Sequence, residues 1–427
     1  YDMYRGIPET KPYHWMSKKF IPMTFGKVET AYAVLQSILF ATHPPFEVLP
    51  REEQDRESAS IFQRLLSYQF DETNVFQEFS LFLKSLLIHG TAIGKVVWDT
   101  TFTKSTQWIE DKEPLFNLFG LKIGERFKGY KEEESRTRTF DGPRFLNLNI
   151  SDIFPDPQAV DIQDGWVIHR TRRTRGYLLQ LLKNFPDSFT REILQITDED
   201  GTETQSNKED IEQSMGRLYQ PQVSRPKYTS LIELLEWWGD YDFDDDGELE
   251  PCIFTVAAGK YLIRAERNPY WHGLKPFIKG VYVSVPNDFY GIGIPEVLED
   301  LQLTLNETFD QRNDNVSFAL NKPAIFKRGS GIDTRKLIFK PGGLYGTDEE
   351  ITGSLQFLDI ANFTRDSHLH QADIERWAQE ATAITSLTMG LGQQEGGKTA
   401  TEAQIRQRAT GNRLGIIAKL LEYSGLQ

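Results

Sequence analysis

One eight-residue stretch near the end of the chain, Gly392–Thr399 (GQQEGGKT), matches the phosphate-binding pattern GxxxxGK[ST] letter for letter. In a nucleotide-binding fold its amides would hold phosphates, Lys398 would reach the β- and γ-phosphates, and Thr399 would bind Mg²⁺. The context argues against this chemistry, because a helical pattern precedes the loop and only the segment 400–427 follows it. Thr399 has a simpler use in a capping box with Glu402. A P-loop nucleotide-binding protein therefore stays as an alternative.

A second stretch, Asp242–Gly247 (DFDDDG), satisfies the first half of a calcium-binding loop, with Asp242, Asp244 and Asp246 as candidate ligands. The bidentate glutamate that such a loop needs at its twelfth position is replaced by Ile253, and the preceding segment is strand-like rather than helical. We predict an acidic hairpin turn here, with weak Ca²⁺ binding by the three aspartates as the alternative.

Two histidines, His368 and His370, lie two residues apart in a helical pattern. They point to different faces of such a helix and cannot share a metal as an i, i+4 pair would, so surface or subunit contacts are predicted for them. The sequence shows no Ser/His/Asp order, no G-x-S-x-G elbow and no Cys–His pair. We therefore predict that the protein is not an enzyme and uses no cofactor.

The composition narrows the class of protein further. The chain has 427 residues, a formal charge of −14 and a pI of about 5.1, which argues against sequence-independent binding to a phosphate backbone. Its single cysteine, Cys252, excludes a disulfide framework and suits a reducing compartment. No apolar run is long enough to span a membrane. The length allows two or three domains, or one elongated subunit.

The chain is organised around a long helix predicted over 295–321, within the stretch Tyr290–Pro323. Pro295 suits the first helical turn, and Pro323 stops the run. At about 1.5 Å per residue the helix is roughly 40 Å long. Its apolar positions form one narrow stripe: Val297, Leu298, Leu301, Leu305, Phe309, Val316 and Leu320. Such a helix is predicted to pack against copies of itself or to span between domains.

The remaining elements alternate in type along the chain. We predict an α+β body up to residue 290, followed by a helix, a small β insert, a helix, a glycine loop and a last helix. A mixed-charge run at 125–139 is predicted as a solvated hairpin or loop, and the polar segment 197–229 as a mobile surface segment. Predicted helices cover 28–42, 52–68, 74–89, 177–185, 188–196, 362–383 and 400–423, and predicted strands cover 91–98, 144–150, 165–172 and much of 231–285.

The string FYGIGIPEVLEDLQLTLNETFDQRNDNVSFALNKP resembles the stem region of portal proteins of tailed bacteriophages. That region combines an aromatic-Gly-x-Gly entry, a D-x-Q…N helix and an N-x-P exit into a β element with a PGG-like turn, here Pro341–Gly343. Three further stretches are similar to the family: NPYWHGLKPF, DYDFDDDG and GKTATEAQ. The resemblance covers about 230–427 by motif and the first 230 residues by element order.

The resemblance implies a portal fold with six parts. These are an antiparallel β and helical wing at 1–290, a first stem helix at 291–321, an α/β clip at 322–360, a second stem helix at 361–384, a tunnel loop at 385–398, and a further wing helix at 399–427 where a crown would start. It also implies a homo-oligomeric ring, usually of twelve subunits, at one capsid vertex of the virion, assembled in the host cytoplasm. Double-stranded DNA would pass through it during packaging and ejection.

The implied partners are a terminase motor, major capsid and scaffold proteins, and tail adaptor proteins. In such a ring the apolar stripes would find partners, and acidic walls would let DNA slide without sticking. Another ring-forming tail adaptor is the remaining alternative. The residues expected to act are, in the stem, Glu299, Leu301, Asp310, Asp314 and Trp377; in the tunnel loop, Thr388, Met389, Leu391, Gln393, Gln394 and Lys398; and in the clip, Lys327, Arg328, Lys336 and Lys340.

Overall fold

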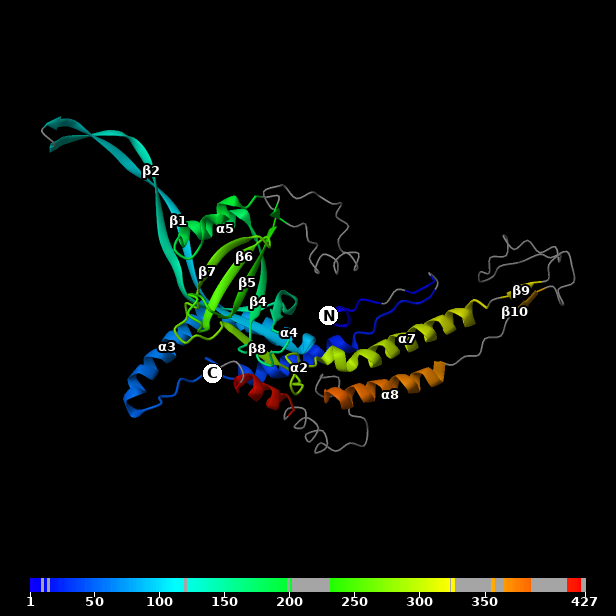
Figure 1. Ribbon diagram of the computed structural model, residues 1–427. Coiled ribbons are helices and arrows are strands. Elements are labelled where there is room, and N and C mark those ends of the chain that lie inside the picture. The colour runs from blue at the N-terminus through cyan, green and yellow to red at the C-terminus, as the bar shows by residue number, and fades with distance from the viewer. Residues whose placement is uncertain are drawn as a thin grey trace.

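The computed structural model has a central α+β body from which two long elements project in different directions (Figure 1). One is the hairpin of β1 and β2, and the other is the helix pair α7 and α8. The structure describes residues 1–8, 11–13, 16–118, 121–197, 200–201, 231–322, 324–326, 355–357, 364–384 and 413–423.

Helices form a layer on one side of the body. Its centre is α4 (Val75–His89), whose buried side chains Phe79, Phe82, Leu83, Leu86 and Leu87 repeat at helical spacing, and which ends at Gly90 with a φ of 77°. The helices around it are α1 (Asp2–Arg5), α2 (Met23–Leu39), α3 (Arg56–Glu72) and the helical residues 413–423. One apolar core joins α2, α4 and 413–423 to the start of α7 and the end of α8.

Two antiparallel sheets complete the body. The three-stranded sheet has the order β2-β1-β8, with β1 (Thr91–Leu118), β2 (Leu121–Leu148) and β8 (Phe277–Val281). The five-stranded sheet runs β3-β4-β5-β6-β7, with β3 (Ile153–Pro155), β4 (Val167–Thr174), β5 (Leu231–Tyr241), β6 (Glu250–Ala257) and β7 (Tyr261–Arg267). Short helices flank it: α5 (Arg175–Asn184) and 3₁₀ turns at Ile150–Asp152 and Arg191–Gln195. A further 3₁₀ turn at Glu53–Asp55 leads into α3.

The projecting hairpin is much longer than the sequence indicates. The predicted strand at 91–98 and the charged run at 125–139 belong to two paired strands of 28 residues each, in register from Ile93–Leu148 to Leu118–Leu121. At about 3.3 Å per residue each strand approaches roughly 90 Å. The charged run ERFKGYKEEESRTRT lacks the alternation of apolar and polar residues from which a strand is predicted, so the sequence pattern hides this length.

The other predicted helices differ mainly at their ends. α2 begins at Met23 rather than at residue 28, because its first turn is held by a distant partner, Gln302. Beyond the body, α7 (Ile294–Leu320) and α8 (Thr364–Thr382) confirm the two long helices. Strand β9 (Ala324–Phe326) follows α7, and strand β10 (Leu355–Phe357) precedes α8. The two strands pair with each other.

Candidate functional site

The base of α7 is fixed to the body by three closely packed glycines. A Cβ on Gly293 would stand 2.7 Å from the carbonyl oxygen of Ile88, and one on Gly291 would stand 2.8 Å from that of Gly90. The N–H of Gly291 donates to Oγ1 of Thr91 at 2.8 Å. Only glycine permits this approach of two backbones, so the Gly-x-Gly entry sets where the long helix leaves the body.

An N-terminal segment, residues 16–24, runs along α7, and we call it the strap. Four of its backbone N–H groups donate to α7 side-chain oxygens spaced four residues apart: Ser17 to Asp314 at 2.9 Å, Lys19 to Asp310 at 2.9 Å, Ile21 to Asn306 at 3.0 Å and Thr24 to Gln302 at 3.1 Å. Two residues of extended chain and four residues of helix cover similar lengths, about 6–7 Å, so the bonds repeat in step along most of the strap.

Gln302 is the anchor of this ladder. Its side chain is fully buried, its Oε1 also accepts from Oγ1 of Thr24 at 2.9 Å, and its Nε2 donates to the carbonyl of Ile21 at 2.7 Å and to Oδ1 of Asn306 at 3.0 Å. A buried amide with all these partners stabilises the strap without an unpaired polar group.

The strap changes the interpretation of two predicted stem residues. Asp310 is only 4% exposed and also pairs with Lys11 at 3.6 Å, so it does not present the open carboxylate that a channel wall needs. The nearby carboxylate of Asp314 likewise accepts from the strap. Leu301 is partly buried against the core of its own subunit, whereas Glu299 is exposed and Trp377 is 45% exposed.

A second side of α7 is covered by α8. Arg312 donates to Gln371 at 3.1 Å and its Nη1 lies 2.9 Å from Nδ1 of His368, while His370 lies 3.4 Å from the hydroxyl of Thr308. Both histidines are exposed, yet both contact α7 of the same subunit, one helical turn apart. They therefore help to align the helix pair.

The first half of α7 carries four exposed carboxylates, Glu296, Glu299, Asp300 and Glu307, and we call these four residues the acidic face. Asp314, seven residues beyond Glu307, continues the same side to the point where the strap covers it. The only basic residue of the helix, Arg312, is turned toward α8. Like charges on one helix face repel each other and any phosphate nearby.

The end of α8 is held by two cations. Nζ of Lys27, in α2, donates to the carbonyl of Ile384, and Arg413 donates to the carbonyl of Ala381 at 3.1 Å. Burial lowers the pKa of Lys27 to about 8, although the charge of Glu375 opposes the shift. Cations near the carbonyl end of a helix are favourable. Lys27 ties this end to α2, and Arg413 joins the residues on either side of segment 385–412.

A buried charged cluster joins the two sheets, and the sequence analysis missed it. Nζ of Lys95, on β1, donates to Oε1 of Glu236, on β5, at 2.5 Å and lies 3.5 Å from Nδ1 of His169, on β4. Burial, helped by the positive charge of Lys95, lowers the pKa of His169 to about 4. Burial raises the pKa of Glu236, but the charge of Lys95, the hydrogen bonds from Lys95 and Trp238 and the charge of His169 together outweigh it, so the net shift is downward. The sequence feature that could have indicated this cluster is Lys95, a charged residue within the otherwise apolar strand TAIGKVVW.

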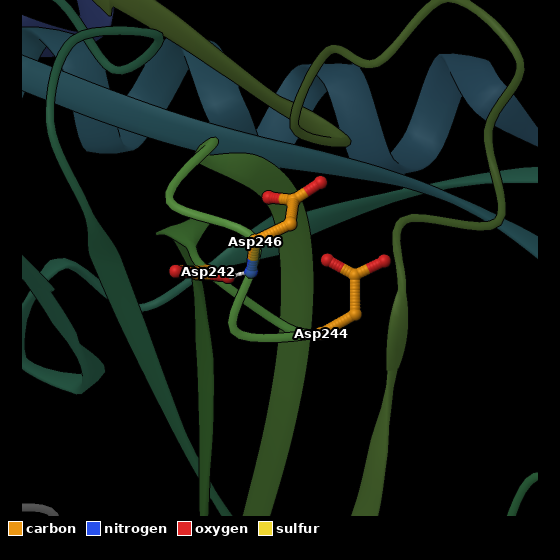
Figure 2. A group of neighbouring side chains, drawn as sticks. All are labelled: Asp242, Asp244 and Asp246. Carbon is orange, nitrogen blue, oxygen red and sulfur yellow. Dashed lines mark hydrogen bonds between the residues drawn. The ribbon is translucent and has the colours of Figure 1, made fainter.

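The predicted acidic hairpin turn is confirmed as the link between β5 and β6 (Figure 2). Asp242 accepts from the N–H groups of Asp246 and Gly247, as short polar side chains do in tight turns. The three candidate carboxylates lie within 4.8 Å of one another, but Asp244 pairs with Arg267 at 2.7 Å. Calcium binding by Asp242, Asp244 and Asp246 stays a prediction.

Several predicted residues lie outside the described part of the chain. They are the phosphate-binding pattern at 392–399, the tunnel-loop residues Thr388, Met389, Leu391, Gln393, Gln394 and Lys398, and the clip residues Lys327, Arg328, Lys336 and Lys340. None of the helices that the structure describes combines the length and apolarity needed to cross a membrane.

The structure thus has an α+β body, a glycine-packed entry into a long polar helix, and a return through a second helix, as the resemblance in the sequence analysis led us to expect. A family model described as Phage SU10 portal protein matches residues 2–425. The chain therefore belongs to this family and is a bacteriophage portal protein, a virion component that serves genome packaging. The match includes the first 230 residues, where the sequence motifs gave only element order.

Proposed function

We propose that this portal protein assembles into a ring of twelve copies at one capsid vertex, with an axial channel for double-stranded DNA during packaging and ejection. The body, residues 1–290, forms the wing, and the segments 291–321 and 361–384, with α7 and α8, form the stem. The clip spans 322–360, the tunnel loop 385–398, and a last wing helix 399–427.

The observation that carries this proposal is the acidic face of α7. The strap bonds to α7 from Gln302 to Asp314 and α8 covers another side, but Glu296, Glu299, Asp300 and Glu307 stay exposed in the single subunit. Around a ring axis, that face would repel the phosphates of a passing duplex rather than bind them. Binding to DNA needs clustered Lys and Arg, and this face has neither.

The pairing of β9 with β10 supports the clip assignment. These strands follow α7 and precede α8, and their antiparallel register from Ala324–Phe357 to Phe326–Leu355 brings the two ends of the insert together. The clip would be the docking surface for the terminase motor and tail adaptor proteins, and the wing would contact capsid and scaffold proteins. On this proposal the protein is a structural conduit rather than an enzyme.

Two measurements test the proposal. Negative-stain imaging and particle mass of the purified protein should show closed rings, and a protein that stays monomeric at high concentration would refute it. The double variant Asp300→Lys/Glu307→Lys should still form rings but package DNA more slowly. Its matched control is Asp187→Lys/Glu192→Lys, which makes the same change in charge at exposed positions on the body. If the two variants package DNA at the same rate, the acidic face does not line the channel.

A further inference from the structure

Helix α3 presents its apolar side away from the body. Its inner side is short of apolar contacts: Ala59 is its one buried residue, and Phe70 packs against Phe40 and Phe46. Ile61, Leu65 and Tyr68, at i, i+4 and i+7 spacing, form its outer stripe and are 65%, 46% and 64% exposed. Phe62 and Leu66 share the helical spacing of Ala59 and Phe70 and are 56% and 41% exposed. A surface helix normally turns such a side toward the core, so this outer face indicates a partner.

A second helix has the same unusual feature. In residues 413–423, Leu414, Ile417, Ala418 and Leu421 are buried in the body. On the opposite side, Ile416, Leu420 and Tyr423 are 61%, 49% and 71% exposed, and their i, i+4, i+7 spacing places them in one outer stripe. Both helices belong to the helical layer, but α3 projects from it while 413–423 lies against α2 and α4 (Figure 1).

We propose that the outer face of α3 in one copy packs against the outer stripe of 413–423 in the next copy. The inference rests on the proposed ring and names two of the surfaces that would close it. A ring requires a head-to-tail contact, in which two different surfaces of one chain meet, and these two faces are different and separate. Pairing of α3 with α3 would instead be two-fold and would stop at a dimer.

The size of the two faces suits a second copy of the chain as the occupant. Six half-exposed apolar side chains offer roughly 100 Å² each, about half of what a large side chain buries, and so about 600 Å² together, close to the apolar share of a small stable interface. A stable interface buries roughly 1,200–2,000 Å² in total, a little over half of it apolar. The charged residues of α3 that flank its outer face, such as Arg64 and Glu72, include both signs, so the face does not suit nucleic acid.

Cysteine cross-linking tests the contact directly. The only native cysteine, Cys252, is 1% exposed, so a bismaleimide should leave the parent protein unlinked. The double variant Leu65→Cys/Leu420→Cys, which places one thiol on each face, should give a covalent ladder that reaches the full ring. Each single variant should be labelled without forming a ladder. Dimers from Leu65→Cys alone, or no ladder from the double variant, would overturn the inference.

A second measurement separates this inference from the ring itself. Leu65→Asp should raise the concentration needed for ring assembly at least about tenfold, the effect of 1.4 kcal/mol lost per contact. Leu249→Asp, at a leucine that is 70% exposed in the β5–β6 turn, is the matched control and should leave assembly unchanged. If the parent protein forms rings that Leu65→Asp does not weaken, only the α3 contact fails. If the parent forms no rings, the proposed function fails first.

Discussion

The strap offers the sharpest test of how α7 is held, through the substitution Gln302→Leu. Leucine has a similar volume and keeps the site apolar, but it removes every hydrogen bond of the buried amide. The N–H and the hydroxyl of Thr24 both lose their acceptor, in a region where Thr24 is fully buried, whereas the carbonyl of Ile21 keeps the N–H of Met23. The perturbation is therefore confined to polar pairing.

The expected size follows from these two stranded groups. An unpaired buried donor or acceptor costs about 1–3 kcal/mol, so two cost about 2–6 kcal/mol. Burial of the leucine side chain returns roughly 1.5–3 kcal/mol. Taking the middle of each range, we expect the free energy of unfolding to fall by about 2 kcal/mol, with the strap released before the rest of the body.

Two assays read this out. Urea unfolding gives the loss of stability, and limited trypsin digestion reports release of the strap through the exposed Lys18 and Lys19. Gln311→Leu is the control, because Gln311 is exposed on the same helix and bonds only to Glu307 among the contacts described. If both variants unfold at the same urea concentration and are cleaved at the same rate, the ladder does not hold the strap and the reasoning fails.

Three further predictions concern the base of α7, the sheet junction and the tunnel loop. Gly291→Ala should lower the melting temperature through a loss of about 1–3 kcal/mol, because its Cβ would overlap Val281 and two carbonyl oxygens. Gly415→Ala, with open space around the glycine, is the control and should be neutral or stabilising. If Gly415→Ala lowered the melting temperature more than Gly291→Ala, the packing argument would be refuted. His169 should make the free energy of unfolding depend on pH, because its pKa falls from 6.5 to about 4 on folding. Its contribution is fully present above pH 6.5, and the free energy of unfolding falls by about 3 kcal/mol as the pH drops to 4. Urea titrations between pH 4 and 7 should show a smaller pH dependence for His169→Gln. Deletion of 387–396 should leave rings intact but impair DNA packaging in an assembly assay, and normal packaging would contradict the tunnel-loop assignment.

The sequence determined the long helices, because helix formation uses contacts between near neighbours. Pro295 and the acids after it favour the start of α7, and the 25 residues that follow carry no helix breaker. Gly90 likewise ends α4 in the left-handed conformation that its position requires. The ordered motifs of the last 200 residues also indicated the family that the match to residues 2–425 establishes.

The tertiary structure decided what each side of those helices does. Asp310 and Asp314 were predicted as stem residues from the sequence, because their strap partners lie 291 and 297 residues away and leave no local pattern. Lys95 and Glu236 likewise leave no local pattern in the sequence, because they meet only where two sheets pack. A helix is specified by its own residues, but the choice of which polar side stays open to water depends on the chain that packs against it.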